Sequence, residues 1–158
     1  MIARLFAASA ALALAAPIAA QTAPTARPDY STARLTPGSW NYQAVAGGSA
    51  ARFMDSSGST RFALECSKAT RQVTISRSSA VAPAAPGLFV WTTDASRSLG
   101  ARFDPTAMRV SVQLAARDPL LDAIAFSRGR VAVTMSGAEA LVMPAWPEAA
   151  RTIEDCRI

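Results

Sequence analysis

Histidine is absent from the 158 residues, and this absence excludes several kinds of site at once. Without an imidazole the chain can build neither a Ser-His-Asp nor a Cys-His nucleophilic centre, and no histidine can ligate a metal ion. Cysteine occurs twice, at Cys66 and Cys156, so a metal centre would depend on two thiolates and carboxylates, which is a poor donor set. We therefore predict no catalytic residues, no metal site and no cofactor.

Lysine is also scarce, because Lys68 is the single example in a basic chain with a net charge of +5. A Ser-Lys catalytic pair would need Lys68 to be buried, whereas it falls in a predicted surface turn. No run of basic residues is present, so we predict no nucleic-acid partner. Asp118 and Asp122 lie one helical turn apart, but catalytic carboxylate pairs flank a cleft, and Asp118 is placed to cap a helix.

One long apolar run occurs, close to the N-terminus. Arg4 precedes the apolar stretch from Leu5 to Ala16, which is followed by Pro-Ile-Ala-Ala. This order predicts a cleavable secretory signal peptide over residues 1–20, cut between Ala20 and Gln21. The stretch is shorter than the roughly 20 residues that span a bilayer, so we expect a periplasmic protein with no stable membrane insertion after cleavage.

Because we expect the chain to be exported, we predict a disulfide between Cys66 and Cys156. Two cysteines in one domain normally form a disulfide in an oxidising compartment. A free buried thiol pair and a metal-binding pair are the alternatives. Cys66 falls on the inward side of a predicted strand, and Cys156 on the inward side of a predicted C-terminal helix. The bridge would close a loop of 90 residues and remove both thiols from catalysis.

The mature chain divides into a lead-in and one domain. Residues 21–36 are rich in Ala, Thr, Pro and Arg without apolar periodicity, so we expect a flexible lead-in that is either a functional arm or a tether. Residues 37–158 form a single predicted β-rich domain, because apolar residues there recur with period two. The expected inward residues include Trp40, Tyr42, Ala44, Phe53, Phe62, Leu64, Cys66, Val73, Ile75, Phe89, Trp91, Leu99, Ala101, Phe103, Val110, Val112 and Leu114.

Turns between these strands bring like faces together in predicted hairpins. The expected cross-strand pairs are Phe53 with Phe62, Ala51 with Leu64, Leu64 with Ile75, Cys66 with Val73, Phe103 with Val110, and Leu99 with Leu114. The proline-containing break at residues 80–87 is a longer loop, where we expect the chain to cross to another sheet. The fold class is therefore mainly β, an antiparallel β-sandwich or a partly open β-barrel.

The period changes near the C-terminus, where we expect two short helices. Asp118-Pro119 is typical of a helix start, and Gly129 of the end of that helix. A strand over residues 130–136 and its return strand follow, and Pro147 opens the last helix.

Arginine supplies nearly all the positive charge, and six arginines are candidate anion-binding residues. Five fall on outward strand positions and one at the corner between the first helix and its following strand; they are Arg52, Arg61, Arg102, Arg109, Arg130 and Arg128. Gathered on one face, they would bind an anionic envelope polymer or an acidic envelope protein. The other interpretation is that outward positions of a half-buried sheet must be polar in any case. Arg128 and Arg130, on either side of Gly129, suit a carboxylate or phosphate as well as a helix C-terminus.

The C-terminal part of the chain carries a resemblance. Residues 118–130 (DPLLDAIAFSRGR), 144–148 (PAWPE) and 154–157 (EDCR) resemble small uncharacterised exported proteins of Gram-negative bacteria. That group carries no known activity, so the resemblance implies a fold and a periplasmic location but no catalytic residues. The order of strands, helix, hairpin and cysteine-bearing helix is more distantly similar to the invasion-associated locus B family, without a shared motif.

These observations predict an exported, non-catalytic accessory or binding module of the cell envelope. One alternative is an inhibitor of a periplasmic or secreted hydrolase such as a protease or lysozyme, with residues 21–36 as its inhibitory arm. The other is an enzyme with a histidine-free site, which requires a pocket where polar groups converge.

Overall fold

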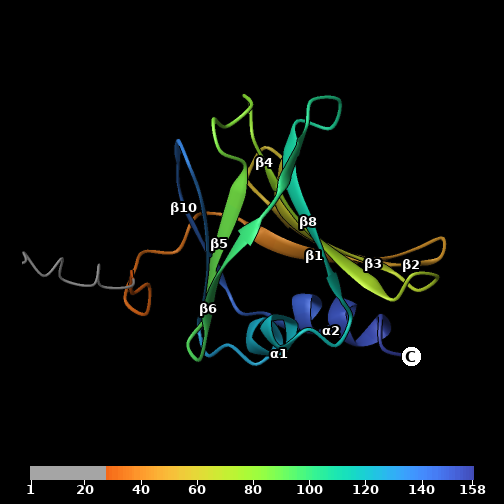
Figure 1. Ribbon diagram of the computed structural model, residues 1–158. Coiled ribbons are helices and arrows are strands. Elements are labelled where there is room, and N and C mark those ends of the chain that lie inside the picture. The colour runs from red at the N-terminus through yellow and green to blue at the C-terminus, as the bar shows by residue number, and fades with distance from the viewer. Residues whose placement is uncertain (1–27) are drawn as a thin grey trace, which may run out of the picture.

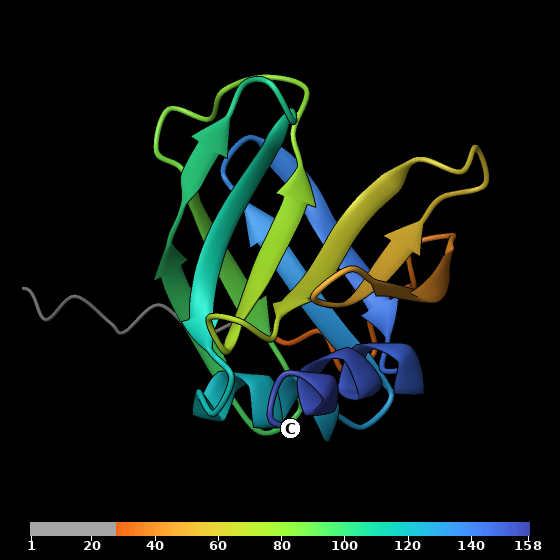
Figure 2. The same ribbon diagram turned by 90° about the vertical axis from the view of Figure 1, so that its right-hand side faces the viewer.

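A computed structural model describes residues 28–158 of the chain. The predicted signal peptide over residues 1–20 and the beginning of the lead-in lie outside the described residues. Two antiparallel sheets face each other, and two short helices lie across one end of the pair (Figures 1 and 2). The predicted fold class is confirmed: the fold is mainly β, with two antiparallel sheets that do not close into a barrel and two short helices near the C-terminus.

The larger sheet has six strands and the smaller sheet has four. In spatial order the larger contains β1 (Ser39–Val45), β2 (Gly48–Met54), β3 (Thr60–Ser67), β4 (Gln72–Ser78), β8 (Arg109–Ala115) and β7 (Arg102–Asp104). The smaller contains β10 (Ala138–Pro144), β9 (Arg130–Met135), β5 (Gly87–Trp91) and β6 (Ser96–Gly100). The chain crosses from β4 to β5 through the predicted loop at residues 80–87.

Five of the six predicted cross-strand pairs are confirmed. They are Phe53 with Phe62, Ala51 with Leu64, Leu64 with Ile75, Cys66 with Val73, and Phe103 with Val110. The sixth is wrong, because Leu99 pairs with Leu88 in the smaller sheet while Leu114 pairs with Val73 in the larger one. The predicted strand is two strands that belong to different sheets, with the crossing at Gly100 and Ala101, where small residues permit a sharp bend.

The inward face of β5 is also the opposite of the predicted one. Leu88 and Val90 are almost fully buried in the main core, at 1% and 0% exposed. Phe89 and Trp91 instead lie on the outer side of the smaller sheet, in a second apolar cluster. All these residues are apolar, so periodicity alone could not tell the two faces of this strand apart.

Residues 28–36 cover that second cluster, and we call this segment the N-terminal strap. The Tyr30 ring packs edge-on against Trp91, with ring centroids 5.9 Å apart. Arg130 donates hydrogen bonds of 2.9 and 2.7 Å to two strap carbonyl oxygens. Residues 28–36 of the predicted flexible lead-in thus make specific contacts with the smaller sheet, while residues 21–27 lie outside the described part of the chain.

The helices α1 (Pro119–Ala125) and α2 (Pro147–Asp155) pack at the lower end of the sandwich in Figure 1. Asp118 caps α1 as predicted, since its side chain accepts a 2.8 Å bond from the Leu120 amide. α1 ends at Ala125, before the predicted end at Gly129. The predicted disulfide is confirmed: Cys66 of β3 is bonded to Cys156, directly after α2, with the two Cα atoms 5.4 Å apart.

Candidate functional site

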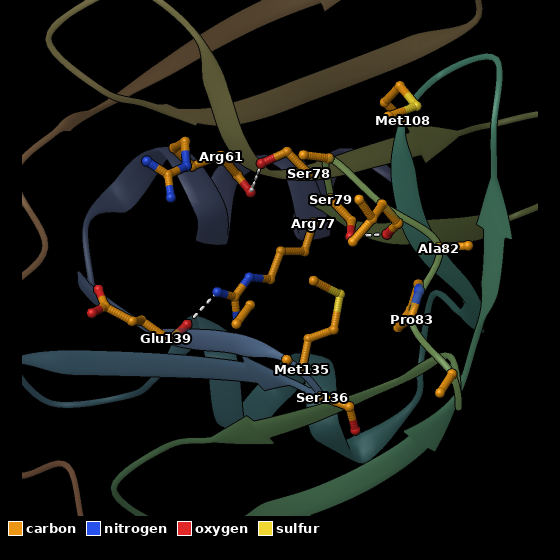
Figure 3. Close-up of a pocket in the computed structure, with 15 residues that line it drawn as sticks. Arg61, Arg77, Ser78, Ser79, Ala82, Pro83, Met108, Met135, Ser136 and Glu139 are labelled. Carbon is orange, nitrogen blue, oxygen red and sulfur yellow. Dashed lines mark hydrogen bonds between the residues drawn. The ribbon is translucent and has the colours of Figure 1, made fainter.

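A pocket of about 790 Å³ opens between the two sheets (Figure 3). The turns that line it are at the end of the sandwich opposite the helices (Figure 1). Its walls come from the end of β4 with the loop that follows, from the turn before β8, and from the turn between β9 and β10. Both sheets therefore contribute to this pocket.

Arg77 extends into the pocket (Figure 3) and is the feature that sets it apart. Alternation along β4 places Arg77 on the same inward face as Val73 and Ile75, and only 5% of the residue is exposed. Nη1 donates a 2.7 Å bond to the Val133 carbonyl oxygen, and Nη2 donates to the Glu139 carbonyl oxygen. Arg77 thus links the larger sheet to the smaller one.

An irregularity in β10 accounts for these carbonyl partners. Between Ala138 and Leu141 the strand carries one residue more than the facing stretch of β9, so the regular ladder is interrupted there. A bulge leaves backbone groups without ladder partners, and a buried carbonyl without a donor is costly. The two guanidinium bonds satisfy carbonyl oxygens beside this irregularity.

The charge on Arg77 has no acidic partner among the described residues, although the guanidinium is buried. The Glu139 carboxylate points away from it (Figure 3). Burial, with a contribution from the nearby charge of Arg61, lowers the pKa of Arg77, but a guanidinium stays protonated at neutral pH. Arg61 itself is half-exposed and lies 3.6 Å from Asp55. The pocket wall therefore holds two arginines and one acid, and no carboxylate of the described residues forms an ion pair with Arg77.

Serines and apolar side chains form the rest of the wall. The Ser78 hydroxyl donates to the Arg61 carbonyl oxygen at 3.4 Å, and the Ser79 hydroxyl donates to the Val81 carbonyl oxygen at 2.6 Å. Met108, in the turn before β8, and Met135, at the end of β9, line the same pocket (Figure 3). Methionine adapts its shape to what it contacts, so this wall suits an apolar body of variable outline.

The arginines predicted as an anion-binding face do not come together in one place. Four lie on strands of the larger sheet, namely Arg52, Arg61, Arg102 and Arg109. Glu65 lies between two of them, 3.3 Å from Arg52 and 3.4 Å from Arg109. Arg130 belongs to the smaller sheet and holds the strap. Acidic side chains thus pair with three of the four arginines on the larger sheet. Arg130, the remaining strand arginine of the prediction, is on the smaller sheet.

The corner at Arg128 and Arg130 likewise forms no joint site. Arg128 lies 3.2 Å from Asp94, and its side chain is 82% exposed, whereas Arg130 is turned to the strap. The predicted carboxylate pair is separated too: Asp118 accepts two bonds from Arg97 at 2.8 and 2.9 Å, while Asp122 pairs with Arg157 at 2.6 Å. Burial alone would raise the pKa of Asp118, but the bonds from Arg97 and the helix amide outweigh it and hold the pKa below its ordinary value.

The six predicted arginines lie on outward strand positions or at the corner after α1, so Arg77 is not among them. The signal was nevertheless present in the alternation Val73, Ile75, Arg77, which places a charged residue in line with two core residues.

Within residues 28–158 no group of three acidic or cysteine side chains is arranged to hold a metal ion. The helices of this part of the chain are all too short or too polar to cross a membrane. No protein-family model, curated protein or solved structure matches the chain.

Proposed function

We propose that this chain is an exported, non-catalytic binding module of the bacterial cell envelope, and that its ligand is a small molecule with an anionic group and an apolar body. The ligand would bind in the pocket between the sheets. The observation that carries this proposal is the buried guanidinium of Arg77, which pairs with no carboxylate of the described residues, at the pocket that both sheets line.

The chemistry of the pocket supports such a ligand. A guanidinium has five N–H groups, and Arg77 uses one from each Nη on carbonyl oxygens, which leaves donors for a carboxylate or phosphate. An unpaired buried charge costs several kcal/mol, and an anion placed beside it recovers part of that cost. The methionine and proline side chains of the wall offer an apolar surface for the rest of the ligand.

The side chains around the pocket also favour binding over catalysis. The hydroxyls of Ser78 and Ser79 donate to backbone carbonyls, and no basic group among the described residues accepts their protons. Both cysteines are in the disulfide, so neither supplies a thiolate. The disulfide is in turn compatible with export to an oxidising compartment, which is where the predicted signal peptide would direct the chain.

Isothermal titration of the mature domain with dodecanoate tests the proposal, with dodecanol as the uncharged probe of the same length. We expect dodecanoate to bind at least about tenfold more tightly than dodecanol, because one charge-assisted hydrogen bond contributes about 1.5–3 kcal/mol. Arg77→Met should remove that preference and leave dodecanol binding unchanged. Arg117→Gln is the matched control, since it removes one exposed arginine that lies next to α1, away from the pocket.

Circular dichroism of Arg77→Met separates loss of the ligand from loss of the fold, and Arg77→Lys keeps the charge without the planar fork. Equal affinity for dodecanoate and dodecanol in the parent domain would refute the proposal. So would a preference for dodecanoate that survives in folded Arg77→Met. Binding of inorganic phosphate as tight as that of dodecanoate would keep the anion site but remove the apolar body from the ligand.

A further inference from the structure

The two sheets have four edge strands, and three of them carry features that prevent another strand from pairing. On β10, the backbone N–H and C=O of Val142 are already bonded to Thr36 of the strap, and the extra residue further interrupts this edge. β7 has three residues and carries Arg102 and Asp104. β6 has five residues and carries Arg97. Short length, charge, a bulge and a covering segment are the devices by which proteins protect their edges.

β1 has none of these devices. Its seven residues, SWNYQAV, contain no charge and no proline, and all seven pair with β2 without a bulge. At about 3.3 Å per residue the strand offers an edge roughly 23 Å long. It is the outermost strand of the larger sheet (Figure 2), and five of its residues are exposed.

The backbone of β1 is open on its outer side. A strand directs half of its N–H and C=O groups to each neighbour, and β1 has one neighbouring strand. No side chain or loop within residues 28–158 donates to or accepts from the β1 backbone on the free side. An edge of this kind is a template for strand addition.

A second pocket of about 420 Å³ lies beside this edge, between β1 and the first turns of α2. Trp40 and Tyr42 line it from the strand, and Glu148 and Arg151 line it from the helix. The Glu148 Oε2 atom is buried without a hydrogen-bond donor. The guanidinium of Arg151 stacks on the Tyr42 ring, 4.0 Å from its centroid. The pocket is thus lined by one acidic and one basic side chain beside two aromatic rings, and one oxygen of the acid lacks a hydrogen-bond donor among the described residues.

We propose that β1 accepts an extended peptide segment of a partner protein as an additional strand, and that a lysine or arginine of this segment enters the pocket at Glu148. In strand addition, backbone bonds supply affinity and alternate side chains supply specificity. A basic side chain supplies the donor that Glu148 lacks and places its aliphatic part against Trp40 and Tyr42. This inference is independent of the ligand proposed for Arg77.

A second copy of this chain is a poorer occupant than a peptide. The β1 strand of a second copy would carry Trp40 and Tyr42 on its inward side, and both side chains already make hydrogen bonds within their own chain. The Trp40 Nε1 donates to the Pro144 carbonyl oxygen at 2.9 Å, and the Tyr42 hydroxyl donates to Asp155 at 2.6 Å. Neither side chain is free to fill the pocket of a partner copy, whereas a peptide brings a side chain with no prior contacts.

The test is an amide NMR titration of the mature domain with acetyl-Thr-Val-Thr-Lys-Thr-Val-Thr-amide, to about 2 mM because a single short strand binds weakly. We expect the largest shift changes in β1 and the first turn of α2. Two further peptides carry backbone N-methyl groups on alternate residues. In the first peptide the methyl groups block the N–H groups along one edge of the strand, and in the second they block those along the other edge. One of the two should lose binding and the other should keep it, because a single peptide edge pairs with β1.

Glu148→Gln tests the pocket separately from the edge. We expect about fivefold weaker binding of the lysine peptide and unchanged binding of its norleucine analogue, since only the former donates to the carboxylate. Glu154→Gln is the matched control on the same helix, outside the pocket. Absence of shift changes in β1, or equal loss with both methylated peptides, would overturn the proposal. Concentration-dependent β1 shifts without peptide, with a dimer in sedimentation, would assign the edge to a second copy instead.

Discussion

Replacing both cysteines by alanine tests how the C-terminal helix is held to the sandwich. The disulfide joins β3 to the residue directly after α2, across a sequence separation of 90 residues. α2 has nine residues, too few for a helix that is stable by itself. Its non-covalent attachment includes the buried side chains of Ala149 and Ile153 and the bond between Tyr42 and Asp155.

The expected loss follows from the length of the closed loop. On the chain-entropy model, cross-linking a loop of about 90 residues restricts the unfolded chain enough to stabilise the fold by about 4.6 kcal/mol at 25 °C. Domains of this size have total free energies of unfolding of about 5–15 kcal/mol. The double variant should therefore stay folded at 25 °C with little stability to spare, and it should unfold well below the parent on heating.

Urea unfolding followed by tryptophan fluorescence measures the effect, because Trp40 and Trp91 are both buried in the folded domain. We expect the double variant to lose about 4–5 kcal/mol and to show a steeper dependence on urea, since its unfolded chain exposes more surface. The parent domain in reducing agent should behave like the variant. A loss below about 2 kcal/mol with an unchanged urea dependence would refute the reasoning, because it would mean that the unfolded chain is not opened by removing the bridge.

Three further changes probe other contacts. Hydrogen bonds hold the pKa of Asp118 low against the effect of burial, so its carboxylate stabilises the fold above about pH 4 and this contribution is lost on acidification. Asp118→Asn, which keeps a capping side chain, should thus flatten the acid dependence of the urea midpoint, and an unchanged profile would contradict this. Gly48→Ala places a Cβ against the backbone carbonyl oxygen of Cys66 in β3 and should cost about 3 kcal/mol in urea unfolding. Gly47→Ala meets open space and should cost only about 1 kcal/mol of backbone strain; equal losses would contradict the steric argument. Arg130→Gln should release the strap, seen as faster proteolysis there and a red-shifted Trp91 emission at a nearly unchanged urea midpoint.

The strands of the larger sheet were predictable because their inward and outward positions differ sharply in polarity. Around Phe53, Phe62 and Leu64 the alternation and the short turns leave a single register that buries every apolar side chain. Near Leu99 the alternation continues through Ala101 to Phe103, although the chain changes sheet there. Inward residues face the same core before and after the change of sheet, so the alternation of apolar residues does not reveal where the chain changes sheet.

The strap was not predictable for a different reason. Its attachment depends on backbone carbonyl oxygens that accept from Arg130 and on one aromatic contact, between Tyr30 and Trp91. Backbone groups are present in every sequence, so composition cannot reveal which of them will be bonded. The same interaction explains why Arg130 does not join the other arginines in an anion site.

Among charged residues, an arginine at an inward strand position is more informative than one at an outward position. An outward arginine on a half-buried strand is expected for solubility alone, and the outward ones here include two that share Glu65. An inward arginine has to overcome desolvation, which lowers the pKa of Arg77, and it persists only where something in the folded protein uses the guanidinium. Two carbonyl oxygens beside the β10 irregularity account for part of this use and leave the positive charge without an anion. A bound anion would accept hydrogen bonds from the remaining donors of Arg77 and would balance its charge, at the pocket that both sheets line.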